Sequence, residues 1–222
     1  MQLDTLDWCV KDFAVDYCEK NTREGKIWTE LHNLRALSFA FTVFRKSSIL
    51  SQVLTQQRAS VKILTLSSLV LGPDTCSWSR NDSQTLATAI SQCKILVRLD
   101  LDEHFLRDSD LEIMLPRLSS LRILLLSGNN WDRAKGYLTD KSCKLISRTC
   151  QGLQELGIGR QHKMTVSGVK RILKNCPHLR MLTTGVTFQP NDIKNVLCTA
   201  RNLLFLLTEE SYDEAFYLEL IE

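Results

Sequence analysis

The chain has 222 residues, of which 44% are hydrophobic and 24% are charged, so it can bury one core of ordinary size or two small ones. Its net charge of +3 makes nucleic acid an unlikely partner, because charge dominates that kind of binding. No apolar run approaches the roughly 20 residues of a membrane-spanning helix, and the acidic first residues lack the pattern of a signal peptide. We therefore expect no membrane contact and a cytoplasmic or nuclear location.

The first segment of the chain is predicted to be helical. Over residues 3–20, the side chains of Leu6, Val10, Phe13 and Tyr17 fall on one helical stripe. We expect residues 1–27 to form an N-terminal helical cap, because the end of a repeat array exposes apolar surface that a terminal element must cover.

A pattern of the form Leu-x-x-Leu-x-Leu/Ile recurs seven times, with drift, over residues 28–208. Its alternation is that of a strand with one buried face. The copies begin at Leu34, Val61, Leu96, Leu121, Leu153, Leu179 and Leu203. A cysteine stands three residues before the start in three copies, at Cys93, Cys150 and Cys176. We expect these cysteines to pack inertly in the core, as a small apolar side chain does at the end of a helix.

Segments of helical period separate the strands. Each begins with a short polar side chain that can cap free backbone N–H groups, at Asp82 or Ser83, Asp108, Thr139–Asp140, Thr165 or Ser167, and Asn191–Asp192. One strand and one helix cannot bury their own apolar faces, so the repeats must stack. The sequence predicts an α/β solenoid of about seven repeats with terminal caps, with parallel strands on a concave face and helices on a convex face.

Three segments, LTDKSCKLISRTCQGLQELGI, MTVSGVKRILKNCPHLRML and LRDSDLEIMLPRLSSLRIL, carry the pattern most clearly. They resemble leucine-rich repeats of the cysteine-containing class, found in F-box/LRR and AMN1-type proteins. The resemblance covers residues 28–208 and is weakest in the first two repeats. It implies a horseshoe-shaped, non-catalytic protein-binding module that recognises substrates or acts as an adaptor in SCF-type ubiquitin ligases, although no F-box opening (Leu-Pro-x-Glu) precedes the repeats. The alternative is a scaffold or regulator unrelated to ubiquitin, such as a GTPase regulator or inhibitor.

Strand side chains that point away from the core are predicted to form a surface for a protein partner, possible partners being ubiquitin-ligase components or their client. The candidates on it are Arg98, Asp100, Arg122, Ile123, Leu125, Glu155, Arg180 and Met181. Long inserts follow the second and fourth strands, and each carries a tryptophan with an arginine two residues later, Trp78 with Arg80 and Trp131 with Arg133. Trp and Arg are common binding hot spots, so both inserts are predicted to contact a partner from one rim. The alternative is that each tryptophan folds back as a lid on the core.

Charge is uneven toward the end of the chain. Residues 156–208 carry eight Lys/Arg against one Asp, whereas residues 209–222 carry six acidic residues and no Lys or Arg. On one helix, Lys170, Arg171 and Lys174 either form a solvated convex face or bind an acidic partner, a phosphorylated segment or the acidic tail itself. The acidic residues 209–222 are either a cap, with Tyr212, Phe216 and Leu220 on one helical stripe, or a truncated eighth repeat.

Motifs that would indicate catalysis do not occur in the sequence. There is no Gly-Lys-Ser/Thr phosphate loop, no G-x-S-x-G and no H-E-x-x-H. None of the eight cysteines forms a C-x-x-C pair, so a zinc or redox site is not expected, and we expect reduced thiols. The sequence therefore predicts a monomer that is not an enzyme and holds no cofactor or metal.

Overall fold

A computed structural model of the chain describes residues 5–9, 33–40, 43–44, 47–67, 70–71, 79–102, 106–127, 138–161, 163–200, 202–208 and 218–219. Seven strands run parallel in one sheet, confirming all seven predicted strand segments. They are β2 (Ala36–Ala40), β4 (Ile63–Ser67), β6 (Arg98–Asp102), β7 (Ile123–Leu125), β8 (Glu155–Ile158), β9 (Met181–Thr184) and β10 (Phe205–Thr208), adjacent in this order.

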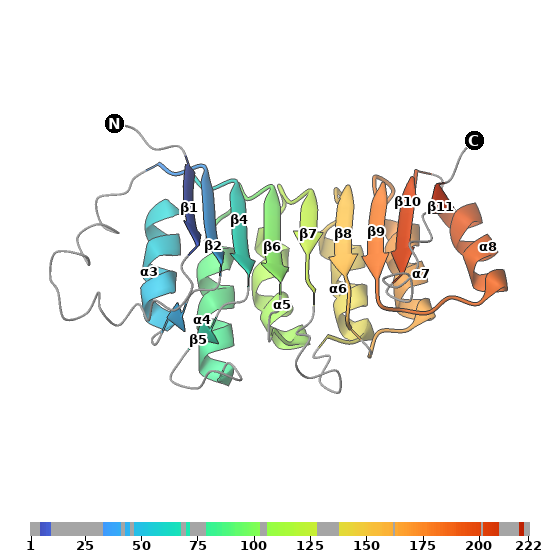
Figure 1. The fold of residues 1–222 in the computed structure, drawn as a ribbon, viewed down its shortest axis with the longest axis horizontal. Helices are drawn as coiled ribbons and strands as arrows, with labels where there is room; N and C mark the ends of the chain where they lie inside the picture. The colour runs from blue at the N-terminus through green and yellow to red at the C-terminus, as the bar shows by residue number, and fades with distance from the viewer. Residues whose placement is uncertain are drawn as a thin grey trace, which may run out of the picture.

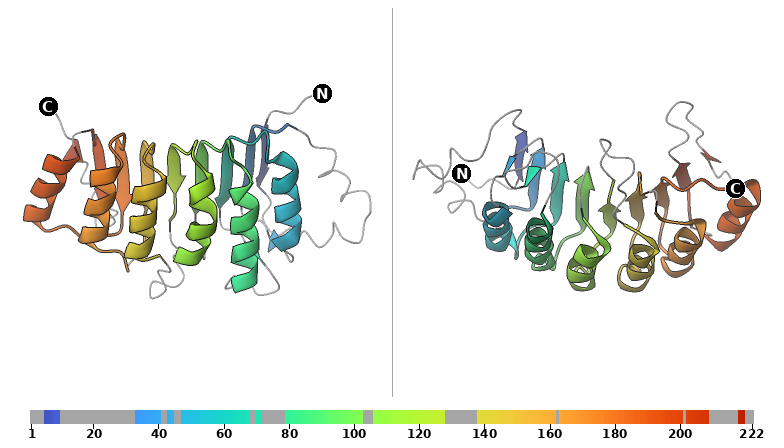
Figure 2. Two further views of the ribbon diagram at one scale, coloured as in Figure 1. Left: turned by 180° about the vertical axis from the view of Figure 1, so that it is seen from behind. Right: turned by 90° about the horizontal axis from the view of Figure 1, so that it is seen from below.

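Helices alternate with these strands and all lie on one side of the sheet (Figures 1 and 2). They are α3 (Ser47–Gln57), α4 (Arg80–Ser91), α5 (Asp108–Met114) with the 3₁₀ turn η1 (Leu115–Arg117), α6 (Asp140–Thr149), α7 (Val166–Asn175) and α8 (Pro190–Thr199). Two short parallel strands, β3 (Val43–Phe44) and β5 (Val70–Leu71), form a separate small sheet. Within the described ranges, none of the helices is long and apolar enough to cross a membrane.

One column of leucines runs through the whole sheet. Its members lie in register on adjacent strands and are almost completely buried, namely Leu37, Leu64, Leu99, Leu124, Leu156, Leu182 and Leu206. Burying one such side chain contributes roughly 1.5–3 kcal/mol. Because equivalent residues of successive repeats stack on each other, each repeat completes the core of the one before it.

The turn from helix to strand is built in the same way in successive repeats. The N–H of the leucine that opens the repeat donates to the carbonyl of the residue three positions earlier, with N···O distances of 3.0–3.1 Å for Leu96, Leu121, Leu153, Leu179 and Leu203. That earlier residue is a buried cysteine in three of these turns. The Cys176 thiol donates to the Cys150 carbonyl of the preceding repeat, with an Sγ···O distance of 3.6 Å. The predicted packing role of the repeat cysteines is confirmed.

The predicted helix starts agree with the structure where the predicted N-cap is a threonine, and the other helices with a predicted start begin earlier than predicted. Thr139 and Thr165 are the N-caps of α6 and α7, and their hydroxyl oxygens accept backbone N–H bonds. By contrast, α4 begins earlier than predicted because Ser79 caps it by accepting the Asp82 N–H at 3.1 Å. Likewise α8 begins at Pro190, whose fixed φ and missing N–H suit the first helical position.

The prediction of one helix over residues 3–20 is wrong at its start. Thr5–Cys9 form the strand β1, which pairs in parallel with β2. An open sheet edge presents unpaired N–H and C=O groups, which a strand satisfies and a helix cannot. In register, Leu6 and Trp8 match Leu37 and Phe39, the two buried positions of β2. The remainder of the predicted cap, residues 10–27, lies outside the described residues.

The opposite edge of the sheet is covered by the strand β11 (Leu218–Glu219), which runs antiparallel to β10. Leu218 and Glu219 are therefore in a strand and not in a helix, while Tyr212, Phe216 and Leu220, which carry the predicted helical stripe, lie outside the described residues. A truncated eighth repeat does not describe this pairing either, since each repeat adds its strand in parallel. The other residues of the acidic segment, 209–217 and 220–222, lie outside the described residues.

Candidate functional site

One face of the sheet bears no helices (Figure 2) and is here called the open face. Because side chains alternate along a strand, every second strand residue faces it. One row consists of Ala36, Ile63, Arg98, Ile123, Glu155, Met181 and Phe205, and the next consists of Ser38, Thr65, Asp100, Leu125, Gly157, Thr183 and Leu207. Every member of both rows is half-buried or exposed except Gly157. The structure thus brings together six of the predicted candidates, although their contact with a partner stays a prediction.

Two of the four exposed large hydrophobic side chains within the described residues, Ile63 and Phe205, lie on the open face. The exposed fractions of Ile63 and Phe205 are 43% and 37%. Phe205 lies in register beside the half-buried Met181, so the two form a continuous apolar strip at the C-terminal end of the sheet. Exposed apolar side chains that adjoin one another, rather than stand singly, indicate an interaction surface.

A charged pair interrupts the apolar residues in the middle of this face. The Arg98 guanidinium and the Asp100 carboxylate lie on the same strand, with an Nη2···Oδ2 distance of 3.3 Å and side-chain exposures of 35% and 18%. In register, Arg98 is flanked by Ile63 and Ile123. Such a pair is already partly desolvated, so a partner that covers it can gain specificity from matching polar groups.

Gly157 lies beside Leu125 on the open face. A Cβ placed on Gly157 would be 3.0 Å from the Leu125 Cδ2 atom. The missing side chain therefore leaves room for Leu125 to lie across the neighbouring strand. Substitution here would displace Leu125 and change the shape of the face without entering the core.

The two arginines just before the strands differ in how freely they can bind. The Arg122 Nη1 donates to the Leu121 carbonyl at 2.9 Å, and its guanidinium lies against Gly152, where a Cβ would approach Nη1 to 2.6 Å. The structure therefore gives the Arg122 side chain a local contact with its own backbone. The Arg180 side chain is exposed, while its carbonyl accepts the N–H groups of Leu204 and Phe205.

Only part of the predicted rim lies within the described residues. Arg80 is exposed, but it is the first residue of α4, so the first insert ends earlier than expected. The predicted insert counted Ser79–Asp82 as loop, whereas the Ser79 cap makes them the start of a helix. Trp78, Trp131 and Arg133 lie outside the described residues.

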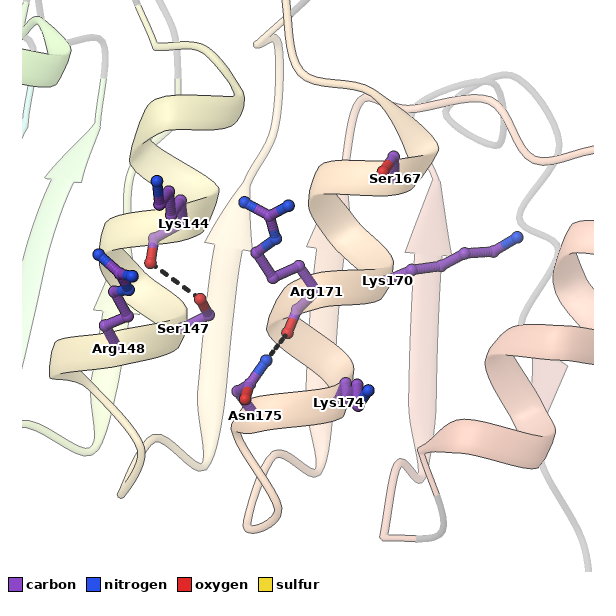
Figure 3. A pocket seen from close by; sticks show the side chains of 8 residues that line it. All are labelled: Lys144, Ser147, Arg148, Ser167, Lys170, Arg171, Lys174 and Asn175. Carbon is purple, nitrogen blue, oxygen red and sulfur yellow. Dashed lines mark hydrogen bonds between the residues drawn. The ribbon is translucent and has the colours of Figure 1, made fainter.

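A basic groove lies on the opposite side of the molecule, between α6 and α7 (Figure 3). Its volume is about 570 Å³, and its lining residues are Lys144, Ser147, Arg148, Ser167, Lys170, Arg171, Lys174 and Asn175. Five of these are cations and none is a carboxylate. The sequence analysis identified the cations of α7 but missed Lys144 and Arg148, which the helical period of α6 places on one face one turn apart.

Four of the five cysteines within the described ranges are buried, and the fifth, Cys198, is exposed. Burial raises the pKa of Cys93 and Cys150 to about 11, and that of Cys143 and Cys176 to about 12. A nucleophilic cysteine needs a lowered pKa and access to solvent, and these four have neither. No cluster of three or more potential metal ligands occurs among the residues that the structure describes.

No protein-family model matches the sequence, and the comparison with curated proteins gives no match. Among solved structures, the chain is similar to the tropomodulin C-terminal domain of Caenorhabditis elegans, with 13% identity and a TM-score of 0.42, over 75% of this chain and 93% of that one.

Proposed function

We propose that the chain is a leucine-rich-repeat solenoid that binds a protein partner on its open face. The observation that carries this proposal is the part of the first open-face row from Ile63 to Phe205, in which the accessible apolar side chains of Ile63, Ile123, Met181 and Phe205 are interspersed with Arg98 and Glu155. These residues stand on rigid paired strands, so a partner would meet a surface that is already ordered. Preorganisation of this kind lowers the entropic cost of binding.

The role we propose for this binding is substrate recognition or adaptor function in an SCF-type ubiquitin ligase. Its support is the resemblance of the cysteine-containing repeats to the F-box/LRR class. The alternative, a scaffold or regulator unrelated to ubiquitin, would use the same open face. Co-purification of the tagged chain with a cullin–adaptor complex distinguishes them, because only the first role requires that complex.

Substitutions of exposed isoleucine and phenylalanine test the open face with a matched control. Phe205→Glu and Ile63→Glu each place a charge on the proposed surface. Ile95→Glu places the same charge on a side chain of similar exposure, 37%, in a helix-to-strand turn away from both open-face rows. All three sites are exposed, so each variant is expected to fold, which urea unfolding checks.

The readout is the amount of each partner recovered with the tagged chain, measured by quantitative mass spectrometry. Truncating a hot spot costs 2 kcal/mol or more, which corresponds to a loss of more than tenfold in affinity. We expect Phe205→Glu and Ile63→Glu to lose the same set of partners and Ile95→Glu to keep it. Equal recovery with all four proteins would refute the proposal.

A further inference from the structure

The cations of the basic groove differ in whether they have an acidic partner. Lys170 turns away from the groove toward α8 (Figure 3), where its Nζ lies 2.8 Å from the Asp192 Oδ1. This hydrogen bond also lowers the pKa of Asp192. Among the residues that the structure describes, Lys144, Arg148, Arg171 and Lys174 form no ion pair. The space between α6 and α7 is therefore lined by positive charge that the described part of the chain does not neutralise.

Folding alone does not account for this charge. Arg148 and Lys174 stand in the last turns of α6 and α7, where a cation interacts favourably with the helix dipole. Lys144 and Arg171 stand in mid-helix and have no such benefit. Moreover, like charges four residues apart, such as Lys144 and Arg148, repel each other on a helix surface. A ligand that supplies negative charge would relieve this repulsion.

Other repeats show that the fold does not require cations at these positions. Nine residues before the start of the strand pattern stand Gln52, Glu112, Lys144, Lys170 and Lys194, and five residues before it stand Gln56, Pro116, Arg148, Lys174 and Cys198, all of them half-buried or exposed. In the repeat of α4 the same spacing falls on the buried Ala87 and Ser91, so that helix offers no comparison. Only the repeats of α6 and α7 are basic at both positions. The two helices that enclose the groove are thus the two whose outer faces are doubly charged.

We propose that the groove between α6 and α7 binds a phosphorylated peptide segment of a protein partner. Arg148 lines it from α6 and Arg171 from α7. In Figure 3 the Arg171 guanidinium lies between the two helices, whereas that of Arg148 lies on the side of α6 away from α7. The planar guanidinium group matches phosphate oxygens in a bidentate manner. Clusters of arginine are the usual means of recognising phosphorylated segments. Residues four apart on a helix are separated by about 6 Å along its axis, so the paired rows suit a ligand with one or two phosphate groups.

Two other anionic ligands fit the structure less well. Single-stranded nucleic acid is bound through stacking on aromatic side chains, and none of the residues that line the groove is aromatic. Of the chain's own acidic tail, the described residues Leu218 and Glu219 pair with β10 at the edge of the sheet, while the groove lies on the helix side between α6 and α7. Single-stranded nucleic acid nevertheless enters the test as a competitor, in the form of oligothymidine.

The test uses a degenerate peptide library that contains phosphoserine and phosphothreonine, immobilised beside the same library without phosphate. The double variant Lys144→Gln/Arg171→Gln removes the two mid-helix cations, both of which are exposed. Lys194→Gln is the matched control, since Lys194 occupies the equivalent position on α8 and is exposed outside the groove. Urea unfolding midpoints show that each variant is folded.

We expect the wild-type chain and Lys194→Gln to bind the phosphorylated library at least about tenfold better than the unphosphorylated one. The double variant should lose that preference, because each charge-assisted hydrogen bond to phosphate raises the affinity severalfold or more. The proposal would be overturned if the double variant kept the same preference for the phosphorylated library or if the wild type showed none. It would also be overturned if oligothymidine displaced the wild-type chain from the library at a lower concentration than phosphopeptide does. The Phe205→Glu variant should bind this library normally, which separates the groove from the open face.

Discussion

Replacing Gly168 with alanine should destabilise the protein, although Gly→Ala in a helix normally stabilises by about 1 kcal/mol. Gly168 lies in the first turn of α7, and a Cβ there would overlap the Asp140 Oδ1 atom and come within 2.9 Å of the Cys143 Sγ. Asp140 cannot move away without losing hydrogen bonds. Its two carboxylate oxygens accept the N–H and the hydroxyl of Thr165, the N-cap of α7, at 2.8 and 2.7 Å.

The magnitude follows from these contacts. Moving the carboxylate away would give up two hydrogen bonds of about 1 kcal/mol each at this exposed site, and the buried Cys143 must also shift. After subtracting the gain in helix propensity, we expect Gly168→Ala to lower the free energy of unfolding by about 1–2 kcal/mol. Urea denaturation measures it. Ser167→Ala, one residue earlier and exposed, is the control and should change stability by less than about 0.5 kcal/mol.

A double-mutant cycle identifies the cause. In an Asp140→Ala background the carboxylate is absent, so adding Gly168→Ala should cost less than it does in the wild type by about 1 kcal/mol or more. The reasoning fails if Gly168→Ala stabilises the protein, as it would in an isolated helix. It fails equally if the cost of the substitution is the same with and without Asp140, because the clash would then lie elsewhere.

Three further outcomes are expected. Gln161→Leu should cost about 2–3 kcal/mol of unfolding free energy in urea, because the buried Gln161 amide accepts the Leu138 N–H and donates to the Leu126 carbonyl; a cost below about 0.5 kcal/mol would contradict this. In the native protein at pH 8, iodoacetamide should modify the exposed Cys198 before the buried Cys150 and Cys176. Peptide mass mapping measures the modification of each cysteine, and equal rates of modification at the three would disprove this prediction. Since burial raises the pKa of the Cys176 thiol from 9.0 to about 12, the unfolded chain loses this proton first, so this thiol alone should lower stability above pH 9 by up to about 1.4 kcal/mol per pH unit. Cys176→Ala should reduce the slope of stability against pH by that amount while Cys93, Cys143 and Cys150 keep their shares, and an unchanged slope would count against it.

The strands of this fold could be predicted from the sequence because the alternation of apolar and polar residues in each repeat indicates which face of its strand is buried. The alternation of Leu64 with Thr65 and Leu66 is a local signal, and the structure keeps it. The terminal strand β1 was beyond such reasoning. Its residues also satisfy a helical stripe, and only pairing with β2, some 30 residues later, decides between helix and strand.

Of the two candidate surfaces, the open face could be predicted from the sequence and the basic groove could not. Which residues face the open side follows from alternation, so the candidates of β6 to β9 could be identified in advance. The basic groove could not, because it exists only where the faces of α6 and α7 meet, and helical periods alone do not say which faces meet. The local engagement of Arg122 with Leu121 and Gly152 is likewise a contact that spacing in the sequence does not indicate.

Site-specific photo-crosslinking tests the proposed open-face binding most directly. A benzophenone amino acid would replace Ile63, Ile123 or Phe205 on the open face, and Gln84, Thr88 or Lys194 on the helices. If the partner binds the open face, covalent adducts of one common partner form from the three open-face positions and none of that partner forms from the helix positions. Adducts of the same partner from the helix positions alone would contradict it.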